Sequence, residues 1–362
     1  MCGKKYDICT QTIAKTFEIL FCMKKEVTTL KKLAQTLELS ISTVSRALND
    51  HPDISVQTKE KVKALALKLN YVPNIFAKGF RNHRSNIIGV IVPNITHYFT
   101  TTIVRGIMEE AESKGFRVII SESNNDVEKQ KEMFNTMMQF GVDGILASLT
   151  KRTREVDHIL ATLNTIPIVL FDKVSNKIPC TQITINDEEA TYNIIEHLIN
   201  IGKKRIAIIK EDQYSYNSEK RYSGYLKALK DNNLELDPKM VISVEDISMK
   251  EGKRMTNILL SSKVRPDAIF AITDGAAIGV IQTLNKFNVK IPEEIAVVGF
   301  SNSEHSIIIE PKLTTVDQPG EKIGRTAVQY LVNEINVPED NITSKLVEIK
   351  SNIVIRDSTF RS

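Results

Sequence analysis

The spacing of apolar residues changes near residue 86 of the chain. Before this point, apolar residues recur every three or four positions, which is the repeat of one face of an α-helix. After it, short apolar runs alternate with amphipathic stretches, as in chains where strands and helices follow one another. The pattern therefore predicts a small helical part followed by a larger α/β part.

Three short helices are predicted in the first part, each preceded by a residue that can cap its N-terminus: Thr29, Ser40 and Ser55. The second helix runs to about Leu48, and only the short turn "ELS" separates it from the first. The apolar residues expected to face a common core are Leu30, Leu33, Ala34, Leu37, Leu39, Val44, Ala47, Leu48, Val62, Leu65, Ala66 and Leu69. A helix, a tight turn, a second helix and a supporting helix form the helix-turn-helix plan.

The second helix lies within "LSISTVSRALND", residues 39–50, and carries small hydroxyl residues and one arginine around its apolar stripe. In a helix that enters the major groove, hydroxyls bind phosphate oxygens, and Arg46 can donate two hydrogen bonds to guanine O6 and N7. Ser40, Thr43, Ser45 and Asn49 suit the phosphate role. An ordinary capped surface helix is the alternative interpretation.

Charge supports the DNA interpretation. Residues 24–86 contain 12 Lys and Arg against 5 Asp and Glu, whereas the whole chain has a net charge of only +4. The remainder is therefore mildly acidic, and the basic surplus is confined to the small helical part. A basic module of this kind indicates a polyanionic partner, although charge alone would equally fit a solvated basic surface.

The second part is predicted to contain parallel sheets covered by helices on both faces, because its strand-like runs are almost continuously apolar. These runs are "IIGVIVP", "RVIISES", "VDGILASL", "IPIVLFD", "TQITIN", "RIAIIKE", "DAIFAITD" and "IAVVGFS". Helices are expected near 103–114, 127–139, 154–164, 188–201, 218–232, 250–262 and 275–287. The length of this part suggests two sheets, with a ligand site beyond the carboxyl ends of the strands.

Composition and missing motifs narrow the function. The chain has 42% hydrophobic and 25% charged residues, no apolar run long enough to span a membrane and no secretion signal. Its four cysteines include no C-x-x-C pair, its six histidines form no cluster, and nucleotide-binding and hydrolase motifs are absent. "GFSNS" at 299–303 lacks the closing glycine of a nucleophile elbow. We therefore expect a cytoplasmic, non-catalytic protein without a metal or cofactor.

Three segments carry a family resemblance: "TVSRALN", "ISVQTKEKV" and "LNYVPNIFAKGFRNHRSNIIGVIVPN". From about Thr28 to Arg356 the chain resembles the lactose/galactose repressor (LacI/GalR) family. The resemblance implies an all-α helix-turn-helix headpiece, a hinge helix and a two-lobed, periplasmic-binding-protein-like α/β core. It also implies a homodimeric transcription regulator, expected to be a repressor, whose affinity for a partly palindromic DNA operator is controlled by a small molecule, expected to be a carbohydrate.

The resemblance implies particular DNA contacts. Ile41, Ser42 and Arg46 fall at the base-reading positions. The positions expected to contact phosphate are Thr29, Ser40, Thr43, Ser45, Asn49, Ser55, Thr58, Tyr71 and Asn74. In the hinge, Ala77 and Phe80 are expected in the minor groove, with Phe80 as the apolar wedge where the family has leucine; packing of Phe80 against the core is the alternative.

The resemblance also implies effector contacts in the cleft between the lobes: His97, Tyr98, Phe99, Ser148, Arg221, Ile247, Thr273, Asp274, Ser301 and Gln318. Two of these positions depart from the family. Ser301 stands where sugar-reading members commonly have Asp, and Ile247 where a large aromatic residue is frequent. Because a hydroxyl is a weaker acceptor than a carboxylate, a modified or oligomeric sugar, or a non-sugar effector, is favoured over a plain hexose. Loop packing or helix capping is the alternative role for each residue.

The expected domains are an N-terminal extension (1–27), the headpiece (28–73), the hinge (74–86) and the core (87–356). The core divides into an N-lobe, about 87–184 and 318–344, and a C-lobe, about 185–316 and 345–356, with crossings near 185, 317 and 345. Residues 1–22 have no family counterpart, and "MKKEVTTL" from Met23 resembles a normal headpiece start. We expect translation to begin at Met23; an additional amphipathic helix is the alternative.

Two other functional classes fit the sequence less well than a regulator does. A transport-associated small-molecule receptor would need a secretion signal and no helix-turn-helix, and an α/β enzyme would need a catalytic motif. Within the regulator interpretation, the sequence leaves open whether the protein represses or activates, because that depends on where the operator lies relative to the promoter.

Overall fold

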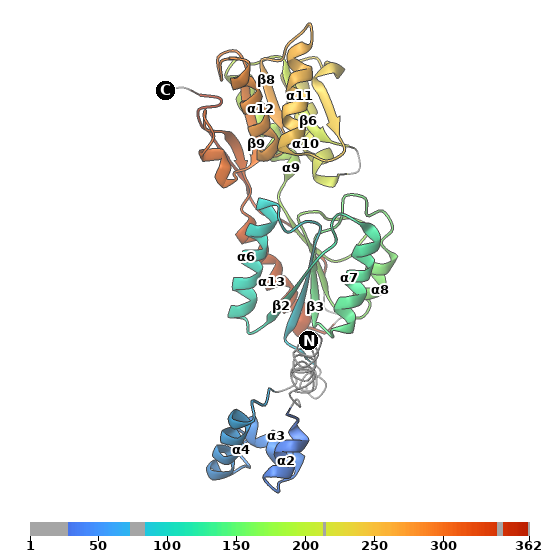
Figure 1. Ribbon diagram of the computed structural model, residues 1–362. Helices are drawn as coiled ribbons and strands as arrows, with labels where there is room; N and C mark the ends of the chain where they lie inside the picture. The colour runs from blue at the N-terminus through green and yellow to red at the C-terminus, as the bar shows by residue number, and fades with distance from the viewer. Residues whose placement is uncertain (1–27, 73–83, 213–214, 339–342, 361–362) are drawn as a thin grey trace, which may run out of the picture. The chain divides into compact units, whose positions relative to one another are not determined.

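The computed structural model describes residues 28–72, 84–212, 215–338 and 343–360 (Figure 1). The chain divides into two compact units, Met1–His83 and Arg84–Ser362, which are described separately. The predicted N-terminal extension lies outside the described residues. So do three residues expected to contact DNA, namely Asn74, Ala77 and Phe80.

The first unit is a three-helix domain made of α2 (Leu30–Thr36), α3 (Ile41–Leu48) and α4 (Val56–Lys68). All three predicted caps are present. The hydroxyl oxygens accept hydrogen bonds from the backbone N–H groups three residues later, at 3.2 Å for Thr29, 3.0 Å for Ser40 and 3.3 Å for Ser55. The core residues are those that the apolar spacing predicts, with Leu33, Val44, Ala47 and Val62 fully buried.

The second unit contains two six-stranded sheets. The first has the order β11 (Leu346–Glu348), β5 (Thr181–Thr184), β4 (Ile168–Phe171), β3 (Gly144–Ala147), β1 (Ile87–Val92), β2 (Arg117–Glu122). The second has the order β12 (Asn352–Val354), β10 (Thr314–Asp317), β9 (Ala296–Ser301), β8 (Ala268–Ala271), β6 (Ile206–Glu211), β7 (Val241–Val244). Every strand pair is parallel except β10 with β12.

Helices cover both faces of each sheet, as the continuously apolar strands require. The first sheet has α6 (Tyr98–Ser113) and α13 (Gly320–Asn336) on one side and α7 (Val127–Gln139) and α8 (Asp157–Leu163) on the other (Figure 1). The second sheet carries α9 (Asp187–Asn200), α10 (Tyr216–Asp231), α11 (Met249–Ser261) and α12 (Asp274–Lys286). Short 3-10 helices occur at η1 (Pro238–Met240) and η2 (Glu304–Ile307).

The predicted helices are present, but several elements were missed. Helix α7 has the predicted bounds, whereas α6 begins at Tyr98, before the predicted start at residue 103. Helix α13 and the strands β7, β10, β11 and β12 were not predicted. Strands β11 and β12 have only three residues each, and neither is fully buried. They therefore lack the continuous apolar run that marked the other strands.

The chain crosses between the two lobes three times. It does so after β5, after β10 and between β11 and β12. The first two crossings agree with the positions expected near residues 185 and 317. The third lies between Glu348 and Asn352, later than the expected position near 345, because β11 pairs with β5 from Leu346 opposite Gln182. Residues 346–348 therefore belong to the N-lobe.

Two glycines allow α6 and α13 to pack closely. A Cβ atom at Gly106 would lie 2.2 Å from the carbonyl oxygen of Glu321, and one at Gly324 would lie 2.2 Å from that of Ile103. Both neighbours are backbone atoms, which cannot rotate away as a flexible side chain can. The short distance between these helices therefore depends on glycine, which has no Cβ atom, at both positions.

We expect Gly106→Ala to lower the free energy of unfolding by about 1–3 kcal/mol, because the added methyl group must push two helices apart. Gly275→Ala is the matched control, since no atom lies within 4 Å of its Cβ position. It should stabilise the protein slightly, by up to about 1 kcal/mol. Urea-induced unfolding measures both. A stable Gly106→Ala protein would show that the helices separate at little cost.

Candidate functional site

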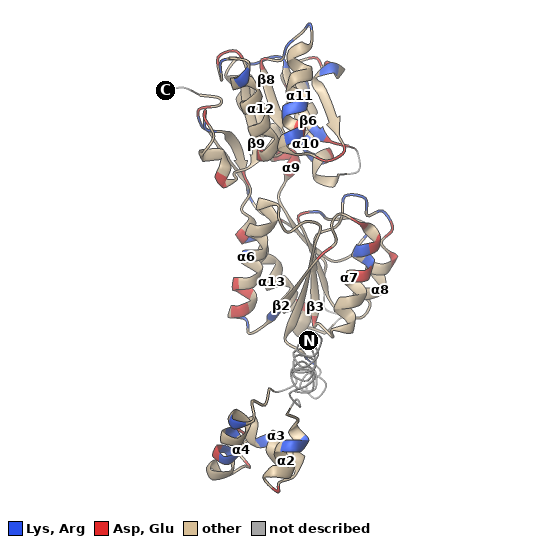
Figure 2. Ribbon diagram, in the orientation of Figure 1, with Lys and Arg blue, Asp and Glu red and all other residues tan. Residues whose placement is uncertain are grey.

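The solvent-facing side of α3 presents the first candidate site. Ile41 has 48% of its surface exposed, and Ser42 and Arg46 are also exposed, whereas Val44 and Ala47 on the opposite side are fully buried. Lys and Arg residues lie on α2 and α4 as well as on α3 (Figure 2). A short helix thus offers an apolar side chain, a hydroxyl and a guanidinium to a partner, on a domain with a basic surface.

The hydroxyls that the sequence assigns to phosphate gather at helix starts. Ser40 shares a hydrogen bond of 2.8 Å with Thr43, and Ser55 shares one of 2.9 Å with Thr58. The first backbone N–H groups of α3 and α4 lie beside these pairs, and helix N-termini favour anions.

The remaining residues assigned to phosphate differ in exposure. Thr29 and Asn49 are exposed, and the Asn49 amide donates to the Ser45 carbonyl at 2.8 Å. Tyr71 is half-buried and packs against the headpiece core. Ser45 is only 6% exposed. Because its side chain faces into the domain, Ser45 is not among the phosphate contacts that we propose.

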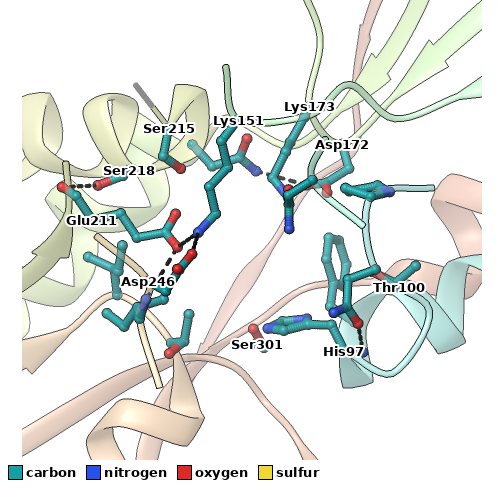
Figure 3. Close-up of a pocket in the computed structure, with 18 of the residues that line it drawn as sticks. His97, Thr100, Lys151, Asp172, Lys173, Glu211, Ser215, Ser218, Asp246 and Ser301 are labelled. Carbon is teal, nitrogen blue, oxygen red and sulfur yellow. Dashed lines mark hydrogen bonds and ion pairs between the residues drawn. The ribbon is translucent and has the colours of Figure 1, made fainter. Parts of the chain in front are cut away.

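The second candidate site is a cavity of about 350 Å³ between the two lobes of the core (Figure 3). Its walls come from the loops that follow strands of both sheets. Asn94 and His97 follow β1, Asp172 follows β4, Thr273 follows β8 and Ser301 ends β9. Parallel strands bring these loops to one edge of each sheet, and the two edges face each other across the cavity.

Seven of the ten residues predicted to bind an effector line this cavity. They are His97, Phe99, Arg221, Ile247, Thr273, Ser301 and Gln318. The other three do not. Tyr98 lines a separate cavity beside the start of α13, and Ser148 is 2% exposed. Asp274 is also 2% exposed and accepts hydrogen bonds from the Ser303 N–H (2.6 Å) and the Thr315 hydroxyl (2.5 Å), so its role is structural.

Eleven polar lining residues were missed by the sequence reasoning, as was the wall formed by Pro93 and Ile272. The polar ones are Asn94, Thr100, Asn125, Lys151, Asp172, Lys173, Glu211, Ser215, Asn217, Ser218 and Asp246. Many lie at or just beyond the end of an apolar run, such as "IVLFDK" and "IAIIKE". The rule that ligands bind beyond the carboxyl ends of the strands, applied to every run, would have found those residues. It would not have found Asp246, which follows β7, a strand that was not predicted.

Arg221 is held firmly in the cavity wall. Its Nε donates to Asp187 Oδ1 at 2.8 Å, its Nη1 donates to the Ile272 carbonyl at 2.6 Å, and its guanidinium lies over the Phe300 ring at 3.7 Å from the centroid. Arg221 is 6% exposed and Asp187 is 3% exposed. Burial raises the pKa of Asp187, although Arg221 opposes the shift.

Three buried polar atoms of the cavity wall have no hydrogen-bond partner within the described chain. They are Asn125 Oδ1, Asn217 Oδ1 and Gln318 Nε2. The other ends of two of these groups are engaged: Asn217 Nδ2 donates to Asp172 at 2.8 Å, and Gln318 Oε1 accepts from Ser301 at 2.9 Å. The Asn217 acceptor and the Gln318 donor are therefore held in fixed orientations, and Asn125 adds a second acceptor. A ligand with several hydroxyl groups could satisfy all three.

Formal charges in the cavity wall are balanced. Three cations, Lys151, Lys173 and Arg221, line it together with three carboxylates, Asp172, Glu211 and Asp246. The cavity walls shield His97 from water, and this desolvation lowers the pKa of the imidazole. The nearby Lys173 lowers the pKa further, so the neutral form of His97 is favoured. A wall with matched charges and a neutral imidazole suits an uncharged polar ligand.

Two further observations concern the described part of the chain. No cluster of three or more His, Cys, Asp or Glu residues there could hold a metal ion. No helix within the described ranges is long and apolar enough to span a membrane.

Two family models match the chain, one over the headpiece and one over the core. Residues 29–74 match the model of bacterial regulatory proteins of the lacI family, and residues 85–355 match that of periplasmic binding proteins and the sugar-binding domain of the LacI family. The chain belongs to the LacI family. It is therefore a DNA-binding transcription regulator that carries a sugar-binding domain.

Two individual LacI-family relatives align with more than nine tenths of this chain. The NTD biosynthesis operon regulator NtdR of Bacillus subtilis (strain 168) is 30% identical over 331 residues, covering 91% of this chain and 99% of the relative. The lac repressor dimer bound to operator and the anti-inducer ONPF has a TM-score of 0.82 at 25% identity, covering 93% of this chain and all of that one.

A third relative shows a sugar on a similar fold. A periplasmic binding protein/LacI transcriptional regulator from Alkaliphilus metalliredigens QYMF, complexed with D-xylulofuranose, has a TM-score of 0.66 at 27% identity. The alignment covers 76% of this chain and all of that one.

Proposed function

We propose that this LacI-family protein is a repressor that binds a two-fold-symmetric operator as a homodimer. Binding of a carbohydrate in the cleft between the lobes changes the affinity of the protein for this operator. The observation that carries the proposal is the solvent-facing side of α3, where Ile41, Ser42 and Arg46 are exposed on a capped helix. The lac repressor dimer, which has a similar fold, is bound to an operator in its crystal structure.

The headpiece residues take distinct roles in this proposal. Ile41, Ser42 and Arg46 read base edges, with Ile41 against a thymine methyl group and Arg46 on guanine. Thr29, Ser40, Thr43, Asn49, Ser55, Thr58 and Tyr71 contact phosphates, and Asn74 joins them. Ala77 and Phe80 enter the minor groove from the hinge. Phosphate contacts fix the position of the protein on DNA, whereas base contacts select the sequence.

An apolar surface of the C-lobe supports the homodimer. Ile307 and Ile308, at the end of η2, are 53% and 73% exposed, and Phe287, just after the neighbouring α12, is 53% exposed. Large apolar side chains gathered on one surface mark a protein contact more often than they mark solvent-facing surface. In a two-fold dimer the same patch would meet its copy.

A carbohydrate effector follows from the three unpartnered polar atoms and the balanced charges of the cleft. Hydroxyl groups both donate and accept, so one sugar can satisfy Asn125, Asn217 and Gln318 together. We also propose that the protein is not an enzyme. Ser301, the last residue of β9, hydrogen-bonds to Gln318 and has no histidine partner among the described residues. A regulator of this kind would act on DNA in the bacterial cytoplasm.

Selection from a random pool of double-stranded DNA tests the proposal. Purified protein should enrich one motif with two-fold symmetry, and that motif becomes the probe for a panel of neutral mono- and disaccharides. A sugar that changes operator affinity would support the effector assignment. Enrichment of no motif, with or without the sugars, would contradict sequence-specific binding.

We expect Asn217→Ala to weaken binding of the effector by about 1–3 kcal/mol, because a ligand hydroxyl loses its buried acceptor. Operator affinity without effector is measured alongside, because the Asn217 amide also donates to Asp172 of the opposite lobe and its loss removes one contact between the lobes. Calorimetric titration with the selected sugar measures the effect. Asn257→Ala, an exposed asparagine on α11, is the matched control, and equal losses in both variants would contradict a direct contact.

A further inference from the structure

Ion pairs connect the two lobes beside the effector cavity. On the N-lobe, the loop between β3 and α8 presents two consecutive cations, Lys151 and Arg152. Lys151 Nζ lies 2.5 Å from Glu211 Oε1 and 2.7 Å from Asp246 Oδ1, both on the C-lobe. Figure 3 shows the Lys151 side chain extending toward these two carboxylates. Arg152 lies 2.9 Å from Glu245 and 4.0 Å from Asp212, also on the C-lobe.

These pairs differ greatly in their surroundings. The side chains of Lys151 and Glu211 are 15% and 9% exposed, whereas those of Arg152 and Glu245 are 57% and 75% exposed. Water and salt screen an exposed pair, which then contributes little. A shielded pair keeps much more of its attraction, and separating it would leave the buried Glu211 carboxylate without the cation that balances its charge. Among these ion pairs, Lys151–Glu211 therefore contributes most of the attraction between the two lobes.

The loop that carries Lys151 is fixed by a buried residue of α7. Gln130 is fully buried. Its Oε1 accepts hydrogen bonds from the Thr150 N–H at 2.8 Å and the Thr153 hydroxyl at 3.1 Å, on either side of the two cations. The amide therefore holds the loop in the position from which Lys151 reaches the opposite lobe.

We propose that Lys151 and Glu211, with Gln130 as the positioning residue, form a latch that holds the two lobes together in the receptor without effector. Closure of a two-lobed receptor is an equilibrium, and a contact made only in the closed form shifts it toward that form. A shielded ion pair between the lobes is such a contact. The proposal concerns the ligand-free protein, so it stands or falls independently of which effector binds.

Distances between spin labels on the two lobes test the latch in the full-length, extensively dialysed protein. Exposed Glu132 on α7 and Lys253 on α11 are replaced by labelled cysteines, and Cys2, Cys9 and Cys22 by serine. Cys180 can remain, because burial raises the pKa of its thiol to about 12 and suppresses its reaction with the label. Double electron–electron resonance then reports the separation of the lobes.

We expect a longer and broader distance distribution in Lys151→Met than in the parent protein. Arg152→Met, the matched control with the same loss of charge one residue away, should leave the distribution nearly unchanged. An unchanged distribution in Lys151→Met would overturn the latch. An equal shift in Arg152→Met would also overturn it, since the effect would then belong to net charge.

Two further variants separate opening from unfolding and test the positioning residue. Lys151→Met combined with Glu211→Gln leaves no unpaired buried charge, so it should fold well and still show the longer distance. A double variant as closed as the parent protein would overturn the proposal. Gln130→Ala should also lengthen the distance, although it leaves both charges in place. If it does not, Gln130 has no positioning role.

Discussion

Arg46→Ala is expected to lose about 1–3 kcal/mol of affinity for the best operator and to relax the choice at one base pair in each half-site. Arg46 is exposed on α3, and a guanidinium that donates two hydrogen bonds to guanine distinguishes it from the other bases. Fluorescence anisotropy at one fixed salt concentration would measure the loss, on the selected operator and on its single-base-pair variants.

Two controls separate base reading from simple charge. Arg46→Lys keeps the charge but loses the two-pronged donor, so it should lose most of the discrimination. Lys68→Ala removes one positive charge at the end of α4 and should weaken binding to all sequences alike, if at all. Uniform weakening by Arg46→Ala as well would identify Arg46 as a phosphate contact instead.

Arg221→Met is expected to lower the free energy of unfolding by about 3–5 kcal/mol at neutral pH, because it leaves the Asp187 carboxylate buried and unpaired. It also removes the donor to the Ile272 carbonyl and the contact with the Phe300 ring. Effector binding should be lost at the same time, since the guanidinium lines the cavity. Urea-induced unfolding and titration with the selected sugar would measure the two effects.

The stability loss should depend on pH. Burial already raises the pKa of Asp187, and removal of Arg221 raises it further. A carboxyl whose pKa is higher in the folded than in the unfolded chain holds its proton more tightly when folded, so stability falls as the pH rises through that interval. The deficit of Arg221→Met should therefore shrink as the pH is lowered from 7 toward 5.

Two variants make this prediction specific. Adding Asp187→Asn to Arg221→Met should recover part of the stability and remove the extra pH dependence. Arg254→Met, which breaks an exposed pair with Glu251 on α11, should change stability little. A loss in Arg221→Met that does not vary with pH would show that packing, and not the unpaired carboxylate, causes it.

Local signals were enough to predict the headpiece and most of the core. Thr29, Ser40 and Ser55 cap their helices as expected, because a cap depends only on residues within one turn. The strands buried on both faces were visible as apolar runs, because such a run is also a local feature of the sequence. Helix α13 was missed although its buried residues Ile323, Ala327 and Leu331 recur at helical spacing, so the local signal was present there and was overlooked.

By itself, the sequence determined that the protein has a capped helix-turn-helix headpiece and a core of parallel sheets. These features depend on periodicity, capping and apolar runs, all of which are local in the chain. The resemblance to the LacI family, and not the local pattern, implied that Arg221 and Gln318 lie in the cleft. Only the tertiary structure decided that Ser45 and Asp274 are buried, that β11 joins the N-lobe sheet and that Lys151 meets Glu211. Burial and pairing depend on segments far apart in sequence, and packing alone brings them together.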